Sequence, residues 1–386
     1  MNGAASEVDL HRHQRTALTV GGIGLLVTVL GFFFDAPQFF RSYLWAYWFW
    51  LGLGIGCLQM LMLFQLTGGA WGFVSQRVFE AAARTLPFMF ILVIPLLFGI
   101  TGLFPWATEQ GQRELGHKSA YLNVPFLLVR LAIYFAVWGG IAVFFARWSR
   151  AADDNPDPRY LRLRKIMSGP GIVIVAFTAS FAVVDWMMSL EPHWFSTVYP
   201  LIHIVGQVLA GLALSILVIA VLSTRPPLAG VVSVNALHDL GNLLLTFTVL
   251  WAYVQFSQLL ITWAGNLPKE IIFYRHRLTG GWQYLGMFLI VAHFFVPFVL
   301  LLSRKTKRNR TALASVAAFI LAMRLFDYLW LIEPAFHQGQ FAVHWLDLAA
   351  PVGIGGLWVA LFLWLLASRP LVAANDPRIV DALERA

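Results

Sequence analysis

The sequence predicts an all-α integral membrane protein with ten transmembrane helices, and three observations lead to this fold class. Hydrophobic residues make up 59% of the 386 residues, charged residues make up only 12%, and the mean hydropathy is +0.72. Apolar stretches of about 20 residues, the length that a helix needs to cross a bilayer, recur along the chain. An acidic and aromatic pattern near the end of the fifth stretch recurs near the end of the ninth.

The apolar stretches give the predicted membrane spans. The first is interpreted as a retained helix rather than a secretory signal, because it reaches about 18 apolar residues and no A-x-A-like cleavage site follows it. No large soluble domain fits between the stretches, so residues 1–386 are expected to form a single membrane domain. The expected spans are 16–34, 43–66, 84–104, 121–147, 170–190, 197–222, 238–263, 281–302, 311–333 and 343–367.

The distribution of positive charge predicts the orientation of these helices. Most of the 27 Lys and Arg residues fall in loops on the side of the two termini, and only Arg130 and Arg324 fall inside spans. Positive residues concentrate on the cytoplasmic side of membrane proteins, so both termini are expected in the cytoplasm. The formal charge of +8 is therefore attributed to orientation and to contacts with lipid phosphates, and no nucleic-acid partner is expected.

Cysteine and histidine usage argues against a resident metal centre. Cys57 is the one cysteine of the sequence, which excludes disulfides, cysteine-ligated zinc, iron–sulfur clusters and C-x-x-C-H haem attachment within this chain. No two histidines have a spacing that requires haem, and His276 and His293 are interpreted as ordinary polar residues. We expect no metal and no cofactor held by this chain itself.

The stretch DWMMSLEP (185–192) recurs as DYLWLIEP (327–334), which indicates an internal repeat. Both the Asp and the Glu are separated from their counterparts by 142 residues, and a histidine follows each copy, as His203 and His344. The offset contains four helices, an even number, so both copies point to the same side of the membrane and the repeat is parallel rather than inverted.

The repeat predicts two four-helix bundles with two flanking helices. Helices 2–5 form the first bundle and helices 6–9 the second. The glycines of WLGLGIGC (50–57) predict that another helix packs closely against helix 2. The expected boundaries are 43–190 for the first bundle, 197–333 for the second, and 16–34 and 343–367 for the flanking helices.

The acidic residues of the repeat are the first candidates for function. A charge in hydrocarbon costs at least about 2.5–3.5 kcal/mol, so a charged side chain inside a span is by default a functional hypothesis. Asp185 has no cation three or four residues away, so it needs a partner on another helix or holds a proton. Asp327 is three residues from Arg324, and their pairing is an equally good structural explanation. Glu191 and Glu333 each precede a proline that ends the helix near the membrane interface.

A polar stripe on the seventh span is the second candidate. At 100° per residue its members lie within an arc of about 100°, which predicts that they face the bundle interior. They form either interhelical hydrogen bonds that only hold the bundle together or a proton path from the cytoplasmic side. The members are His238, Asp239, Asn242, Thr246, Tyr253 and Ser257.

Four longer strings resemble a known family. They are EAAARTLPFMF (80–90), DWMMSLEPHWFSTVYP (185–200), HDLGNLLLTFTVLWAYVQFSQLLITWAGNLPKEI (238–271) and HFFVPFVLLLSRKTKRN (293–309). Together they are similar to the ActF membrane subunits of bacterial alternative complex III, in the wider NrfD/PsrC-like family. The sequence departs from that family where relatives tend to carry Lys in place of Asn242 and Glu in place of Lys269.

The resemblance implies a quinol-oxidising assembly in the bacterial inner membrane. Its expected partners are a homologous NrfD-like quinol-binding subunit, an iron–sulfur subunit, a multihaem cytochrome c subunit and small membrane subunits. Iron–sulfur clusters and c-type haems would lie in those partners. This chain would hold no cofactor, with quinol as the one ligand left open, and would contribute proton transfer rather than act as an enzyme alone.

We therefore expect a membrane subunit that couples quinol oxidation to proton movement. One alternative is a quinol pocket at the periplasmic ends of helices 2–5. Another is a purely structural role for the acids. An ion-coupled secondary transporter is also open, although the parallel repeat and the expected absence of a broken helix argue against it. The predicted proton path comprises Asp185, Glu191, His203, His238, Asp239, Asn242, Thr246, Tyr253, Arg324, Asp327 and Glu333.

Overall fold

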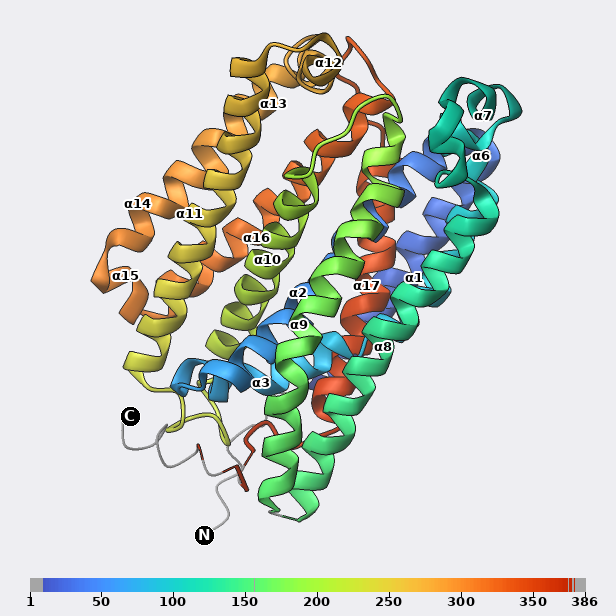
Figure 1. Cartoon of the computed structure of the whole chain (residues 1–386). Helices are drawn as coiled ribbons and strands as arrows, with labels where there is room; N and C mark the ends of the chain where they lie inside the picture. The colour runs from blue at the N-terminus through green and yellow to red at the C-terminus, as the bar shows by residue number, and fades with distance from the viewer. Residues whose placement is uncertain (1–9, 156, 374, 377, 379–386) are drawn as a thin grey trace.

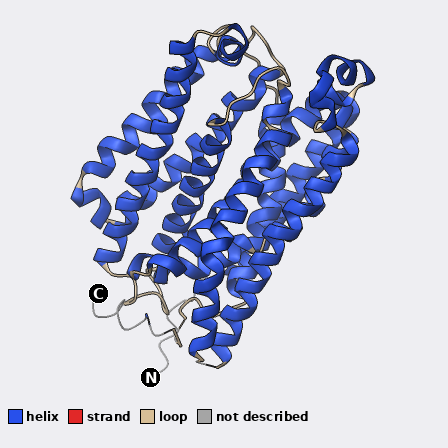
Figure 2. Ribbon diagram, viewed as in Figure 1, coloured by secondary structure: helices blue, strands red, loops and turns tan. Residues whose placement is uncertain are grey.

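The computed structural model describes residues 10–155, 157–373, 375, 376 and 378. In this part of the chain 84% of the residues are helical and no strand is present (Figure 2). Ten helical segments of the described chain are long and apolar enough to cross a membrane. The prediction of an all-α membrane protein with ten spans is confirmed.

Most of the long helices run roughly side by side, and consecutive helices follow one another through short connections (Figure 1). Short 3-10 or π-helical turns over Pro105–Ala107, Gly116–Ala120, Met188–Leu190, Ile290–Phe295 and Glu333–Ala335 lie between them. The α-helices are α1 (Leu10–Phe34), α2 (Ala36–Thr67), α3 (Ala70–Ala83), α4 (Leu86–Leu92), α5 (Ile94–Phe98), α6 (Ile100–Leu103), α7 (Glu109–Leu115), α8 (Val124–Asp154), α9 (Pro158–Trp186), α10 (Tyr199–Leu222), α11 (Val234–Gly265), α12 (Pro268–Arg277), α13 (Trp282–Leu289), α14 (Val296–Leu302), α15 (Arg304–Arg308), α16 (Arg310–Ile332) and α17 (Leu346–Ala367).

Several spans are longer than the apolar stretches that predicted them. The second begins at Ala36 rather than at 43, and the fifth begins at Pro158 rather than at 170. In both, an aspartate one residue earlier (Asp35, Asp157) caps the first turn by accepting a backbone N–H. A capped helix satisfies its own backbone and can continue beyond the hydrocarbon, so apolar composition alone underestimates its length.

Two spans contain local interruptions of the α-helical pattern, although each continues as one helical segment across its length. The third span (Ala70–Phe98) consists of α3, α4 and α5 and contains Pro87 and Pro95, which have no N–H to donate to the helix. The eighth contains the π-helical turn Ile290–Phe295 directly before Pro297. The two interruptions do not occupy corresponding positions in the two bundles, so they do not favour a transporter with paired broken helices.

Helices contact one another within spans 2–5 and within spans 6–9, the two bundles expected from the repeat, and contacts also run between the two groups. In the first group α2 contacts α3 and α9, and α8 contacts α9; in the second α10 contacts α11 and α16, and α13 contacts α16. α2 and α10 contact each other and are the most buried of the ten spans. The two groups therefore meet along α2 and α10, while α17 packs on α2 and α1 packs on α17.

Glycines allow α2 and α10 to approach closely. A Cβ atom at Gly56 would lie 1.9 Å from the backbone oxygen of Gln207, and one at Gly211 would lie 2.8 Å from the backbone nitrogen of Cys57. A side chain at either position would thus collide with the backbone of the facing helix. The close packing predicted for 50–57 is present in the structure.

Replacing Gly56 by leucine is expected to force α2 away from α10 and to lower the thermal stability of the whole protein. Overpacking a close-packed contact costs about 1–3 kcal/mol, and a contact with backbone cannot be relieved by a rotamer change. Thermal unfolding of the purified protein in detergent measures the loss. Gly140→Leu is the control, because nothing lies within 4 Å of a Cβ there; equal losses in both variants would contradict the prediction.

α1 and α17 run antiparallel in close contact. A Cβ at Gly21 would lie 2.8 Å from the Cα of Gly356, and one at Gly24 would lie 2.9 Å from the Cα of Gly353. The start of α1 and the end of α17 therefore lie at the same end of the molecule (Figure 1). Below, this end is called the terminal end and the other the opposite end.

Candidate functional site

The four acids of the repeat lie in the half of the molecule towards the opposite end, where α9 and α16 finish. Asp185, Asp327 and Glu333 are at most 1% exposed, and the side chain of Glu191 is 10% exposed. Burial removes water as a partner, so each carboxyl group needs donors or an opposite charge from the protein. The four acids differ in whether they receive them.

Asp185 forms a two-point ion pair with Arg130 of α8. The Arg130 Nε donates to Oδ2 at 2.8 Å and Nη2 donates to Oδ1 at 2.9 Å, while the Tyr134 hydroxyl donates to Oδ2 at 2.7 Å. The guanidinium also packs over the ring of Tyr121, 3.9 Å from its centroid. Of the two interpretations of Asp185, the partner on another helix is correct. Arg130 could have been assigned from sequence, since an arginine inside a span also needs a carboxylate.

Glu191 is neutralised by the segment that follows α11. Arg277 donates to Oε2 at 2.9 Å, and His276 Nδ1 lies 2.6 Å from Oε1. Arg277 also donates to the backbone oxygen of Leu331 at 2.6 Å and therefore ties the end of α9 to the end of α16. Burial raises the pKa of Glu191, but the charge of Arg277 and the hydrogen bonds from both residues outweigh it and hold the pKa below its usual range.

Acidification is expected to weaken this junction. A carboxylate whose pKa is lower in the folded state contributes stability that is present above its unfolded pKa, about 4.3 for Glu. That stability is lost as the pH falls through the folded pKa of Glu191. The midpoint of thermal unfolding should fall on acidification through this range. Glu191→Gln should lower the midpoint at neutral pH and flatten its pH dependence, and an unaltered pH dependence in the variant would contradict the pairing.

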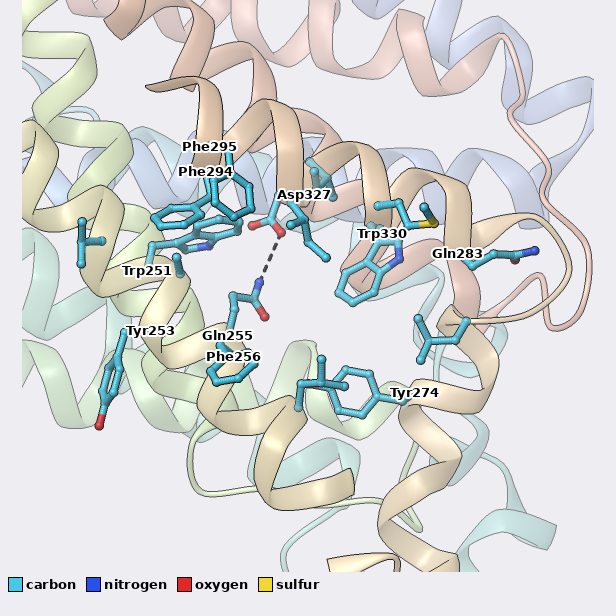
Figure 3. Close-up of a pocket in the computed structure, with 18 residues that line it drawn as sticks. Trp251, Tyr253, Gln255, Phe256, Tyr274, Gln283, Phe294, Phe295, Asp327 and Trp330 are labelled. Carbon is cyan, nitrogen blue, oxygen red and sulfur yellow. Dashed lines mark hydrogen bonds between the residues drawn. The ribbon is translucent and has the colours of Figure 1, made fainter. Parts of the chain in front are cut away.

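Asp327 pairs with Arg324, which lies one helical turn earlier on α16. This pairing is the structural explanation that the sequence analysis gave for the two residues. Gln255 of α11 donates to its Oδ1 at 3.4 Å (Figure 3). The Arg324 guanidinium lies over the ring of Tyr328 and against Gly206, where a Cβ would come within 2.2 Å of Nη2. The glycine on α10 thus leaves the space that the buried arginine occupies.

Glu333 differs from Glu191, its counterpart in the repeat. It is fully buried, and neither of its carboxyl oxygens has a hydrogen-bond partner among the described residues. His337 Nε2 lies 3.6 Å from Oε2, which is too long for a hydrogen bond. Burial and the nearby charge of Arg41 lower the pKa of His337, which favours its neutral form. The same position of the repeat is therefore charge-paired in one copy and without a donor in the other.

Asp347, at the start of α17, is a buried carboxyl group close to His337 that the sequence did not single out. It accepts hydrogen bonds from Ser42 at 2.6 Å, from the Gln38 side chain at 3.3 Å and from the backbone N–H of His344 at 2.7 Å. Because its donors are neutral groups of α2 and of the segment before α17, spacing along the chain could not reveal them. Asp347 is fully supplied with donors, and Glu333 is not.

His203 lies between the two bundles and makes aromatic contacts rather than contacts with the acids. Trp48 Nε1 donates to its Nδ1 at 3.1 Å, and its ring centroid lies 4.7 Å from that of Tyr199 and 5.6 Å from that of Tyr328. The cavity beside Trp48 and Tyr134, between α2, α8 and α9, has a volume of 10 Å³. That is room for about one water molecule, so it does not support a quinol pocket there.

The prediction that the whole polar stripe of α11 faces the bundle interior is wrong, because two of its members are exposed and the others, Ser257 among them, are only partly buried. Tyr253 is 66% exposed and Thr246 is also exposed, whereas the buried side of the helix carries Leu240, Leu244 and Trp251. The reason is local hydrogen bonding: the Thr246 hydroxyl donates to the backbone oxygen four residues earlier, at 2.9 Å, and so needs no partner on another helix.

The beginning of the same stripe lies at the terminal end of α11. His238, Asp239 and Asn242 are partly buried there. Lys307 of α15 donates to Asn242 Oδ1 at 2.7 Å, and Asn242 Nδ2 lies 3.3 Å from His238 Nδ1. These contacts hold α15 against α11. The structure does not join these residues to the acids near the opposite end, so the two parts of the predicted path remain separate.

No family model matches this chain, and no curated protein is similar to it at a significant level. Among the described residues, no three His, Cys, Asp or Glu side chains come together in a group that could hold a metal ion. Asp185, Glu191 and Asp327 have charged partners, and Glu333 is the repeat acid without a hydrogen-bond donor.

Proposed function

We propose that this chain is a membrane subunit of a quinol:acceptor oxidoreductase and that Glu333 carries a proton that is exchanged during quinol oxidation. The expected setting is the bacterial inner membrane, with both termini in the cytoplasm. Iron–sulfur clusters and c-type haems would lie in partner subunits, one of them a homologous quinol-binding subunit. The resemblance to the ActF family supports this assembly, and the surroundings of Glu333 support its role in it.

The difference between Glu333 and Glu191 carries the proposal. Glu191 accepts from Arg277, so its charged form is stabilised. Glu333 is fully buried with no donor to either oxygen, and a carboxylate in such surroundings is costly, whereas the neutral acid is not. A purely structural acid would be expected to have the partners that Glu191 has.

His337 supplies a route from Glu333 to the surface. Its side chain is 24% exposed and lies 3.6 Å from the carboxyl group, and a small movement would bring the two groups into hydrogen-bonding distance. Quinol oxidation releases protons, so an acid and a neutral imidazole near the opposite end could receive them. Asp327, which is already paired with Arg324, is a less suitable carrier.

Purification from native membranes under mild conditions tests the assembly. If this chain belongs to a quinol-oxidising complex, the preparation should contain haem and non-haem iron, together with subunits that bind them. A chain that purifies intact without haem, iron or redox partners would contradict the assembly. Transport of a solute by the purified chain in liposomes would favour the transporter alternative instead.

A further inference from the structure

A cavity of 650 Å³ lies in the side of the second helix group, between α11, α13 and α16 (Figure 3). This volume falls within the range of about 300–1,000 Å³ that is typical of small-molecule sites. The walls are almost entirely apolar, and seven of the 18 lining residues are aromatic. None of the residues that line it except Tyr253 and Asp327 belongs to the proton path predicted from sequence.

The exposure of the lining residues shows which way the cavity opens. Tyr253, Phe256 and Met287 are 66%, 60% and 62% exposed and form the rim. Asp327 and Trp330 are 1% and 9% exposed and form the floor. The rim residues belong to two membrane spans, so the mouth opens sideways towards the hydrocarbon rather than towards water. An occupant would therefore enter from the bilayer.

Apart from the phenols of Tyr253 and Tyr274 and the amide of Gln283, the polar groups of the cavity lie at its floor. Gln255 donates to the Asp327 carboxylate there (Figure 3). Trp330 is more than nine-tenths buried, and its indole N–H has no acceptor among the described residues. A Cβ at Gly286, another lining residue, would lie 3.1 Å from this nitrogen. The missing side chain at Gly286 thus leaves space beside an unused hydrogen-bond donor.

We infer that the cavity binds an uncharged, planar lipophile that carries an oxygen on its ring and enters with that oxygen leading. The oxygen would accept from Trp330 Nε1, because an unsatisfied buried donor gains a full hydrogen bond from such a partner. The aromatic walls suit a flat ring, and the apolar rim suits a hydrocarbon tail that remains in the bilayer. A cationic head is not required, because Arg324 already balances the charge of Asp327.

The position of the polar groups also argues against a glycerolipid as the occupant. A glycerolipid keeps its head at the membrane interface and would insert its hydrocarbon chain ends, which cannot accept from Trp330. An ionised fatty acid would bring a second negative charge towards Asp327. The inference does not depend on the proton-carrying role of Glu333, because it concerns binding beside α16, and Glu333 follows that helix.

Photolabelling of the native preparation that contains the full chain tests the inference. The probe is a benzoquinone with a decyl tail and an azide on the ring; the comparison probe is phosphatidylcholine with a diazirine near the end of one acyl chain. We expect the quinone probe to label peptides from α11 and α13, and unlabelled decylbenzoquinone to suppress this labelling. Competable labelling of the same peptides by the lipid probe alone would overturn the inference, as would no labelling of them by the quinone probe.

Two variants locate the site within the cavity. Gly286→Leu fills the space beside the indole and should reduce the competable labelling about tenfold. Trp330→Phe keeps an aromatic ring but removes the donor, and should weaken competition by about 2- to 10-fold. Phe288→Leu is the control, because Phe288 lies on the same helix, is 46% exposed and does not line the cavity. Equal labelling in Gly286→Leu and the control would overturn the site, whatever the result for Glu333.

Discussion

Replacing Asp185 by asparagine should strongly destabilise the protein. Asp185 is fully buried and neutralises Arg130, whose side chain is 8% exposed, through two hydrogen bonds. Removing one partner of a buried pair leaves an uncompensated charge and costs roughly 3–5 kcal/mol. The midpoint of unfolding in detergent, by heat or by denaturant, measures the loss.

Two further variants separate this charge effect from a general sensitivity of the region. Replacing both partners by apolar residues of similar size, Arg130→Met with Asp185→Leu, should recover most of the lost stability because no unpaired charge remains. Glu109→Gln breaks a pair whose side chains are 84% and 95% exposed, and should change stability very little. A double variant as unstable as Asp185→Asn would show that the charge pair is not the cause.

Glu333→Gln, unlike Asp185→Asn, should cause little loss of stability and a large loss of function. Glutamine has nearly the shape of the protonated acid and places no charge in the site, so the helices should pack as before. Glutamine cannot release a proton, however. The number of protons moved per electron during quinol oxidation should therefore fall, and only the protons that the partner subunits handle should remain. The measurement is the number of protons translocated per electron by the complex in liposomes.

Glu191→Gln is the matched comparison, because it makes the same chemical change at the equivalent position of the other repeat. It leaves Arg277 buried without its carboxylate, so it should lower stability rather than alter the proton count of complexes that remain folded. An unchanged proton-to-electron ratio in a stable Glu333→Gln complex would contradict the proposed role. So would equal effects of the two glutamine variants.

The ten spans could be predicted from the sequence because a helix that crosses hydrocarbon must be apolar over a fixed length. Span boundaries were less accurate, because caps such as Asp157 extend helices into the polar interface. The Arg324–Asp327 pair could also be predicted, since both residues lie on one turn of the same helix. The Arg130–Asp185 pair joins two helices and its partners are 55 residues apart, so spacing does not show it; the signal in the sequence is that each residue is a charge alone inside a span.

The site itself was only partly predictable. Glu191 and Glu333 are equivalent in the sequence pattern, and they differ because Arg277, in the segment after α11, reaches only the first of them. The face of α11 was predicted wrongly because a polar stripe does not reveal whether its hydroxyls bond to another helix or, like Thr246, to their own. The cavity beside Trp330 depends on Gly286 from another helix, and only the folded structure brings the two together.

The protonation state of Glu333 can be observed in the infrared spectrum of the intact complex. A protonated carboxyl group has a C=O stretching band that is separate from the bands of carboxylates and shifts in heavy water. We expect such a band at neutral pH, lost in Glu333→Gln and retained in Glu191→Gln, and changed when quinol is added. A spectrum in which Glu333→Gln removes only carboxylate bands would show that Glu333 is ionised, and would contradict its role as a proton carrier.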